Sequence, residues 1–368
     1  MTDAAPVVFR ATDLRVSLYD ADDVPRKRPR PHGAQDDVLS PPWRSAIRGV
    51  SFEVRRGEVL SIVGESASGK TLSMYAALRL LGPGAQATGG EVELFGQSFP
   101  VRVDNNSIGS PGRHRRGRVV DPDDEWRRLL GSRVGILFQD PIGAWTPQLT
   151  IGEQAGEALD EHFSLTTEEI ERRVRDALGS VNLPKRGFGA FSFLLSRGQA
   201  QRAMLAAAIV KAPDLLIADE PLAGLDPNSA ASILALLRDM QEARGMAMIF
   251  ITHDLARAAS FSDRIAVMYA GRIVETGLVE DVIRRPRHPY TEGLIGALPM
   301  VGQDRLRPIR GAPPRLLELF AGCSFASRCD FVSNRCADVP PLVHSAGDSA
   351  DACWRSGELS LQGLSSAR

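Results

Sequence analysis

The sequence predicts an α/β fold with a mostly parallel central sheet, on three observations. Apolar segments at 57–64, 214–219 and 246–252 alternate with helical ones such as 229–243, the order of a parallel sheet flanked by helices. Segment 57–64 is apolar on both faces, as in a strand buried on both sides. A glycine-rich turn follows it directly and leads into a helix from Lys70 to about Leu81.

The remaining strand-like segments predict an antiparallel β edge beside this core. Residues 7–19 alternate in the manner of an edge strand, and further strands follow at 47–54 and 89–96. Two polar segments, 20–42 and 100–130, carry many charges and prolines, so we expect exposed insertions there.

A helical block at about 151–211 interrupts the strand and helix alternation. It includes the amphipathic segment 166–178, which begins with a predicted capping box of Thr166 and Glu169. We interpret the block as a subdomain inserted into the core. The expected parts are 1–150 and 212–283 for the two halves of the core, 151–211 for the helical subdomain, and 284–368 for a C-terminal extension.

Composition excludes several function classes. The chain has 368 residues, 43% of them hydrophobic, and a formal net charge of -1, so no overall field favours nucleic acid or an anionic membrane. The N-terminus has no apolar stretch with a cleavage site, and no segment reaches the ~18 apolar residues of a membrane span. We therefore expect a cytosolic protein whose membrane role, if any, comes through partners.

The segment "GESASGKT" at 64–71 matches the G-x-x-x-x-G-K-[ST] phosphate loop, placed between an apolar strand and a helix. Its glycines let backbone N–H groups face phosphate oxygens, and the helix dipole favours the anion. Lys70 is expected to reach the β and γ phosphates of ATP, and Thr71 to hold Mg²⁺. The candidate nucleotide-binding residues are Gly64, Glu65, Ser66, Ala67, Ser68, Gly69, Lys70 and Thr71.

A second acidic motif, "LLIADEP" at 215–221, delivers Asp219 and Glu220 to the end of an apolar strand. Open α/β sheets bind ligands at that end of their strands. Asp219 suits water-mediated Mg²⁺ coordination, and Glu220 suits a general base that orients the attacking water. Adjacent acids after a strand more often cap a helix, so it is the combination with the phosphate loop that favours ATP hydrolysis.

At these residues the sequence resembles the nucleotide-binding subunits of ABC transporters over most of the chain. The resemblance implies that Gln139 in "LFQDP" ligates Mg²⁺ and senses membrane subunits, and that His253 in "ITHD" contacts the γ phosphate. Asp226 in "AGLD" is expected at a dimer interface. The family signature LSGGQ corresponds to "LSRGQ" at 195–199, so Ser196, Gly198 and Gln199 would bind the partner subunit's ATP.

Two features of the family pattern stay open in this sequence. Arg197 replaces a glycine of the signature; if the position required a positive φ, it would be strained by ~1 to 3 kcal/mol. The family also stacks an aromatic residue on adenine upstream of the phosphate loop. Tyr19 is our candidate, and Trp43, on the other side of the first insertion, is the alternative.

The C-terminal part resembles one branch of the family. "RRPRHPYTEGLIGALP" at 284–299 and "IRGAPPRLLELFAGCSFASRC" at 309–329 resemble segments of oligopeptide, dipeptide and nickel importers. The implied function is ATP hydrolysis that drives peptide uptake, with nickel or another small solute as the alternative cargo.

The resemblance also implies partners and a location. The partners would be a second ATPase subunit, two transmembrane permease subunits and, indirectly, an extracytoplasmic binding protein. The protein would lie peripherally on the cytoplasmic face of the membrane. A soluble ABC ATPase of translation or DNA repair would carry two cassettes or a long coiled coil, and a non-enzymatic regulator would lack Glu220 or His253.

All four cysteines lie in the extension, spaced C-x5-C-x6-C-x16-C: Cys323, Cys329, Cys336 and Cys353. A reducing cytosol disfavours disulfides, whereas four thiolates in a short loop-rich tail suit a metal. Zn²⁺ and an iron-sulfur cluster both accept four thiolates, and His344 would allow a mixed zinc site. The resemblance implies an iron-sulfur cluster of the 4Fe-4S type.

Overall fold

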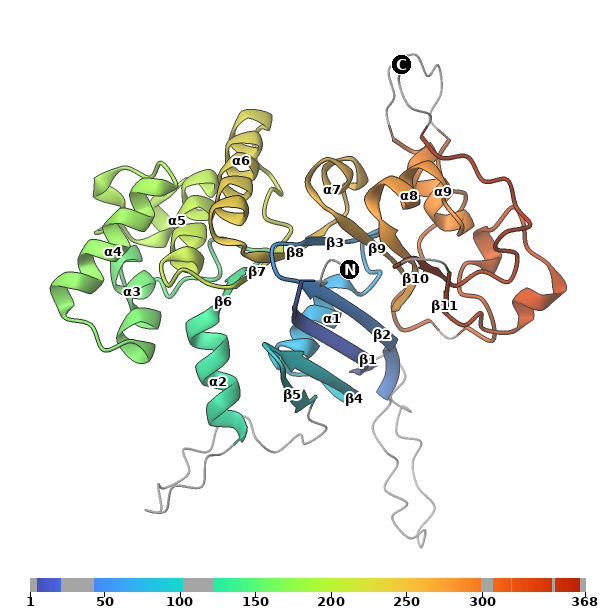
Figure 1. The fold of residues 1–368 in the computed structure, drawn as a ribbon, viewed down its shortest axis with the longest axis horizontal. Helices are drawn as coiled ribbons and strands as arrows, with labels where there is room; N and C mark the ends of the chain where they lie inside the picture. The colour runs from blue at the N-terminus through green and yellow to red at the C-terminus, as the bar shows by residue number, and fades with distance from the viewer. Residues whose placement is uncertain are drawn as a thin grey trace, which may run out of the picture.

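The structure is a computed structural model that describes residues 5–20, 43–101, 122–298, 307–318, 320–345 and 348–364. Most of the first polar insertion and residues 102–121 of the second lie outside the described residues. Two sheets form the centre of the molecule, with helices around them (Figure 1).

The larger sheet has a parallel core, as the sequence predicts. Its strand order is β11-β12-β10-β9-β3-β8-β7-β6, and the last five strands pair in parallel. Strands β3, β7 and β8 are buried along their whole length, because helices cover both faces. The parallel strands are β9 (Arg264–Tyr269), β3 (Val59–Val63), β8 (Ala247–Thr252), β7 (Leu215–Asp219) and β6 (Val134–Leu137).

The antiparallel end of this sheet comes from the C-terminal half of the chain. Strand β10 (Arg272–Leu278) turns back on β9, and two short strands of the extension, β12 (Ala350–Asp351) and β11 (Val343–His344), pair beyond it. The extension therefore continues the backbone hydrogen bonding of the core sheet.

The smaller sheet is antiparallel, with the order β2-β1-β4-β5. The expectation that residues 7–19 form an edge strand is wrong, because β1 (Val7–Tyr19) lies between β2 (Trp43–Arg55) and β4 (Ala85–Leu94). The sequence hides this position, since register shifts break the alternation of buried and exposed residues along β1. The edge on the β4 side is β5 (Gln97–Pro100).

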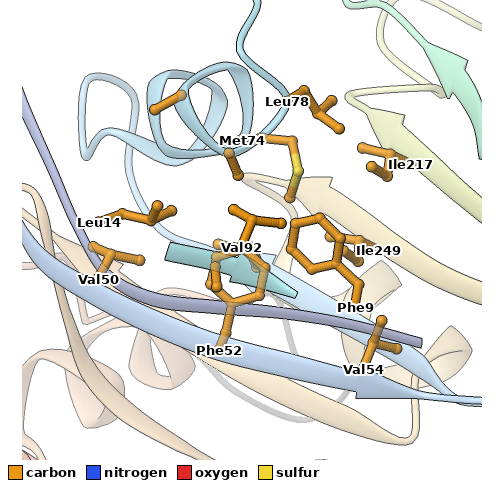
Figure 2. Packing of buried hydrophobic residues seen from close by; sticks show 14 of the residues in the cluster. Phe9, Leu14, Val50, Phe52, Val54, Met74, Leu78, Val92, Ile217 and Ile249 are labelled. Carbon is orange, nitrogen blue, oxygen red and sulfur yellow. The ribbon is translucent and has the colours of Figure 1, made fainter. Parts of the chain in front are cut away.

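Helix α1 (Lys70–Ala77) packs between the two sheets. Met74 and Leu78 from this helix region meet Phe9 and Val92 of the small sheet and Ile249 of the large one (Figure 2). This core fixes the helix that follows the glycine-rich turn.

The helices α3 (Ile151–His162), α4 (Thr167–Ser180) and α5 (Arg197–Ile209) form a separate group at one end of the large sheet (Figure 1). Thr166 caps α4, and its hydroxyl accepts the Glu169 N–H. This is one half of the predicted capping box, since the return bond from the Glu169 side chain is not made. Between this group and the extension, α6 (Pro227–Arg244) and α7 (Leu255–Phe261) connect the parallel strands.

The second polar insertion was expected to be a loop through residue 130, but helix α2 (Pro122–Arg133) begins inside it. Trp126 and Leu129 are 4% and 2% exposed in the core. Trp126 packs edge-on against Phe99, and the Arg79 guanidinium lies over its ring. Two apolar contacts thus anchor a segment whose other residues are largely charged.

Helix α8 (Val279–Arg284) leads into the C-terminal extension, which contains α9 (Pro289–Gly296) and two single turns, η4 (Ala326–Arg328) and η5 (Asn334–Ala337). The extension lies at the opposite end of the large sheet from α3 to α5 (Figure 1). Among the described helices, none is both long and apolar enough to cross a membrane.

Candidate active site

The glycine-rich turn lies between β3 and α1 and is held tightly. Gly64 has φ 156°, and a Cβ there would lie 2.2 Å from the Met268 carbonyl oxygen. Gly69, with φ 101°, is the N-cap of α1. Lys70 Nζ donates to the carbonyl oxygens of Gly64 at 2.9 Å and Glu65 at 3.1 Å. The predicted residues 64–71 therefore form one compact loop at a helix N-terminus, the arrangement that binds phosphate.

Asp219 and Thr71 meet at the end of β7. Thr71 Oγ1 donates to Asp219 Oδ1 at 3.0 Å. Burial raises the pKa of Asp219 to about 6, and the Thr71 hydrogen bond opposes this shift. Burial likewise lowers the pKa of Lys70, against the attraction of Glu220 and Asp219. The phosphate loop and the acidic motif, far apart in sequence, thus meet in one partly buried site.

Glu220 and His253 lie in contact beside this pair. His253 Nδ1 lies 2.9 Å from Glu220 Oε1; the histidine side chain is 62% exposed, and that of Glu220 11%. Glu220 adopts φ 47°, a left-handed conformation that costs a non-glycine residue ~1 to 3 kcal/mol and is concentrated at functional sites. A hydrogen bond from its N–H to the Ile251 carbonyl, 2.9 Å long, stabilises that backbone.

The signature segment starts helix α5. Ser196 is the N-cap, and its hydroxyl and the Gln199 side chain form a reciprocal capping box. Arg197 is the first helical residue and is absent from the described non-glycine residues with positive φ. The backbone strain considered for Arg197 is therefore absent.

Several predicted residues lie outside the phosphate-loop cluster. Gln139 is exposed just beyond β6, and Gly198 lies in the first turn of α5. Asp226 caps α6 by accepting the N–H groups of Asn228 and Ser229. In Figure 1, α5 lies at one end of the large sheet and α1 beneath its middle.

The two candidate adenine-stacking residues lie side by side in the small sheet. Tyr19 and Trp43 are paired across β1 and β2, with ring centroids 5.8 Å apart in an edge-on arrangement. Tyr19 is 40% exposed. The two candidates, separated in sequence by the first insertion, form a single aromatic pair.

The extension contacts the phosphate loop through two residues that our sequence analysis did not select. Tyr290 Oη accepts the Glu65 N–H at 2.9 Å. Arg328 donates to both carboxylate oxygens of Glu65, at 2.6 and 3.0 Å. The "HPYT" and "CSFASRC" segments were visible in the sequence, but only as branch markers, because nothing local shows which distant residue they touch.

The four cysteines are partly buried and free. Burial, and to a smaller extent the other thiols, raises the pKa values of Cys323, Cys329 and Cys353. Backbone N–H groups approach three of the sulfurs at 3.3 to 3.5 Å. Those of Phe331 and Arg355 lie two residues after Cys329 and Cys353, and that of Ser333 lies three residues before Cys336. Within the described ranges, however, no three His, Cys, Asp or Glu side chains are grouped closely enough to hold a metal ion.

Comparison with known proteins decides the family. The ABC transporter family model matches residues 47–223, and the model of the oligopeptide/dipeptide transporter C-terminal region matches residues 274–336. A probable peptide ABC transporter ATP-binding protein of Sinorhizobium fredii is 38% identical over 85% of this chain and 90% of the relative. The chain belongs to the ABC transporter ATPase family.

Further relatives place this ABC ATPase in the oligopeptide and dipeptide branch. The dipeptide transport ATP-binding protein DppD of Bacillus subtilis is 37% identical over 84% of this chain and 88% of its own length. The oligopeptide transport ATP-binding protein OppD of Mycobacterium bovis is 40% identical over 84% of this chain, which spans about half of that relative, 49%.

A solved structure supports the fold of the ABC ATPase core. An ATP-binding cassette, determined as a dimer in a post-hydrolysis state with ADP and phosphate, superposes with a TM-score of 0.57 at 22% identity. The superposition covers 74% of this chain and 98% of the chain of the solved cassette. The predicted α/β fold, with its parallel sheet, antiparallel sheet and inserted helices, is confirmed.

Proposed function

We propose that this ABC ATPase binds ATP with Mg²⁺ on residues 64–71 and hydrolyses it with Glu220 as general base. The observation that carries the proposal is the contact of Glu220 with His253, beside the Thr71 and Asp219 pair. Lys70 and the loop N–H groups would hold the phosphates. Glu220 would accept the proton of the attacking water, and His253 would orient Glu220 and contact the γ phosphate.

The residues present fit a magnesium ion. Asp219 Oδ2 is buried without a hydrogen-bond partner among the described residues, and Mg²⁺ prefers such hard oxygen ligands. Thr71, Asp219 and Gln139 would supply its protein contacts. When bound, the ion supplies positive charge against the charge that develops on the transferring phosphoryl group.

A second ATPase subunit would complete the site. Ser196, Gly198 and Gln199 start α5 away from the phosphate loop of the same chain (Figure 1). Phe193 and Leu194, just before them, are 63% and 66% exposed, as expected of a partner-facing surface. We propose that this face covers the partner's ATP and that Asp226 lies at the same interface, while Tyr19 or Trp43 stacks on adenine.

We propose di- and oligopeptides as the transported cargo, since relatives named for peptide, dipeptide and oligopeptide transport match along the extension as well as the core. Nickel or another small solute is the alternative. Two permease subunits would anchor the ATPase to the cytoplasmic face of the membrane, and a binding protein would deliver the cargo. The four expected parts of the chain would then be two core halves, a helical signature subdomain and the extension.

An apolar groove is our candidate contact for the permeases. It encloses about 530 Å³ between α2, α3, α5 and the segment after β6, and its lining includes Phe138, Trp145 and Met204. Gln139, expected to sense the membrane subunits, directly follows Phe138 in the sequence.

We propose further that Cys323, Cys329, Cys336 and Cys353 hold a metal centre, an iron-sulfur cluster in preference to zinc. The N–H groups that approach three of the sulfurs support this, because such donors stabilise thiolate ligands. The spacing of the sulfurs in the structure gives no support of its own.

The hydrolysis proposal is tested with Glu220→Gln. Loss of the base is expected to lower ATP turnover about 10²- to 10⁴-fold while ATP binding persists. Turnover is measured on the chain co-purified with its operon partners, with peptides as cargo. Glu242→Gln, an exposed change on α6, is the matched control; equal turnover of wild type and Glu220→Gln would refute the role of Glu220.

The metal proposal is tested by elemental analysis and absorbance of anaerobically purified protein. We expect about four iron and four sulfide per chain and a brown colour that Cys329→Ser removes. A colourless protein with one zinc per chain would overturn the cluster in favour of zinc, and a metal-free wild-type chain would overturn both.

A further inference from the structure

A side chain of the C-terminal extension, Arg328, forms an ion pair with the phosphate loop. Arg328 and Glu65, 263 residues apart, form a bidentate pair with N to O distances of 2.6 and 3.0 Å. The Arg328 side chain is 5% exposed and that of Glu65 24%. Planar arginine to carboxylate pairs of this kind are directional as well as strong, so the pair defines where Glu65 lies.

Arg328 is itself rigidly placed. Its Nε donates to the Arg310 carbonyl oxygen at 2.8 Å. Its guanidinium lies over the rings of Tyr269 and Phe325, which also pack against each other and against Tyr290. The pairing with Glu65 raises the pKa of Arg328 further above its ordinary value. The arginine therefore stays charged and oriented by the core of the extension.

Glu65 links this arginine to the lysine of the phosphate loop. Its N–H donates to Tyr290 Oη, its carboxylate accepts from Arg328, and its carbonyl oxygen accepts from Lys70 Nζ. Each polar group of this one residue thus has its own partner, two of them in the extension. A change in the extension would shift the backbone on which Lys70 rests.

We propose that Arg328 is a positioning residue of the ATP site, which makes the affinity for MgATP depend on the folded C-terminal extension. This inference rests on the proposed function, since it assumes that residues 64–71 bind ATP. Thermodynamic linkage then requires the converse, that MgATP bound to the loop stabilises the extension around Arg328.

The test measures the dissociation constant for MgATP on the full-length purified chain. Arg328→Gln is expected to weaken binding on the order of 10-fold, the size of a typical coupling between sites. Arg328→Lys, which keeps the charge but loses the fork, should fall between wild type and Arg328→Gln. Arg310→Gln removes a solvent-exposed arginine pair with Asp330 in the same extension and should bind like wild type.

A double-mutant cycle separates positioning from loss of fold. Glu65→Gln should weaken binding about as much as Arg328→Gln, and the double variant no more than either alone, since all three break one interaction. Additive losses, or an Arg328→Gln chain that binds MgATP as wild type does, would overturn the proposal. If Arg328→Gln does not fold, Arg328→Lys and Glu65→Gln carry the same test.

Hydrogen exchange supplies a readout that a merely structural role would not move. MgATP should slow exchange of the amides at 325–329 in wild type, and Glu65→Gln should abolish that slowing. Identical protection in both proteins would contradict the inference. A wild-type chain that does not bind MgATP at all would instead refute the proposed function, which keeps the two failures distinct.

Discussion

At the scale of single residues, Arg197 shows how a departure from a motif is absorbed. It occupies the first position of α5, where the backbone has ordinary helical dihedrals and no positive φ is required. Its side chain lies along the "AGLD" loop, so close that a Cβ at Gly224 would lie 2.9 Å from Arg197 Nε. The arginine thus lies between the signature segment and the "AGLD" loop of its own chain without disturbing the serine cap.

We expect Arg197→Gly to change ATP turnover by a modest factor, about two- to threefold. The Ser196 cap and the Gln199 bond persist in the variant, and glycine in a helix destabilises by about 1 kcal/mol relative to better helix formers. Turnover and melting temperature of the variant, measured in the complete transporter, check this. Complete loss of transport would show that Arg197 itself is required.

At the scale of elements, the junction of β10 and α9 explains the "HPYT" segment. His288 caps α9, and its Nδ1 accepts the Tyr290 N–H. Glu275 of β10 accepts the N–H groups of Arg287 and His288. The buried carboxylate and histidine therefore hold the start of α9 so that Tyr290 reaches Glu65.

This junction predicts a pH dependence. Burial raises the pKa of Glu275 from 4.5 to about 7 and lowers that of His288 from 6.5 to about 3. The raised pKa of Glu275 stabilises the folded state fully below pH 4.5, and this contribution is lost as the pH rises through 7. The lowered pKa of His288 stabilises the folded state fully above pH 6.5, and this contribution is lost as the pH falls through 3. Between pH 4.5 and 6.5 the two slopes oppose each other.

Glu275→Gln removes only the acid's slope. The free energy of unfolding of the variant should therefore rise with pH from 4.5 to 6.5, relative to wild type, by at most ~1.4 kcal/mol per pH unit. Denaturant unfolding at several pH values measures it. Glu280→Gln, on the exposed face of α8, is the control. A difference in unfolding free energy between Glu275→Gln and wild type that does not change with pH would contradict the assignment.

At the scale of the whole molecule, the extension and the nucleotide core share one structure. Strand β12 pairs with β10, and one apolar cluster contains Val63 at the end of β3 together with Tyr290 and Phe325. Arg48 of β2 also donates to the Glu318 carbonyl oxygen. Such shared packing predicts that the extension unfolds together with the core.

Phe325→Ala tests this cooperativity. Phe325 is 3% exposed among three aromatic rings, and loss of a buried phenylalanine typically costs about 3 to 5 kcal/mol. We expect calorimetry to show the main transition of the whole chain moved to lower temperature. A separate early transition, with the main one unchanged, would show that the extension is an independent unit.

The sequence alone determined the motifs, the strand and helix alternation and the family, because those depend on local residue patterns. Residues 64–71, Asp219 and Glu220 could be selected from their spacing. The interior position of β1 and the helical start of α2 inside a charged segment were missed, since pairing partners and two buried contacts decide them.

Only the tertiary structure decided what the extension does to the nucleotide loop. In the sequence, Arg328 and Tyr290 belong to branch-specific segments, and Glu65 is one of the candidate nucleotide-binding residues of the glycine-rich loop. Folding of the sheet brings Tyr290 and Arg328 into direct contact with Glu65, which lies more than 200 positions before either of them. The physical reason is that local residue patterns determine helices, strands and turns. A bidentate ion pair between distant segments forms only when packing brings the two side chains together in the right orientation.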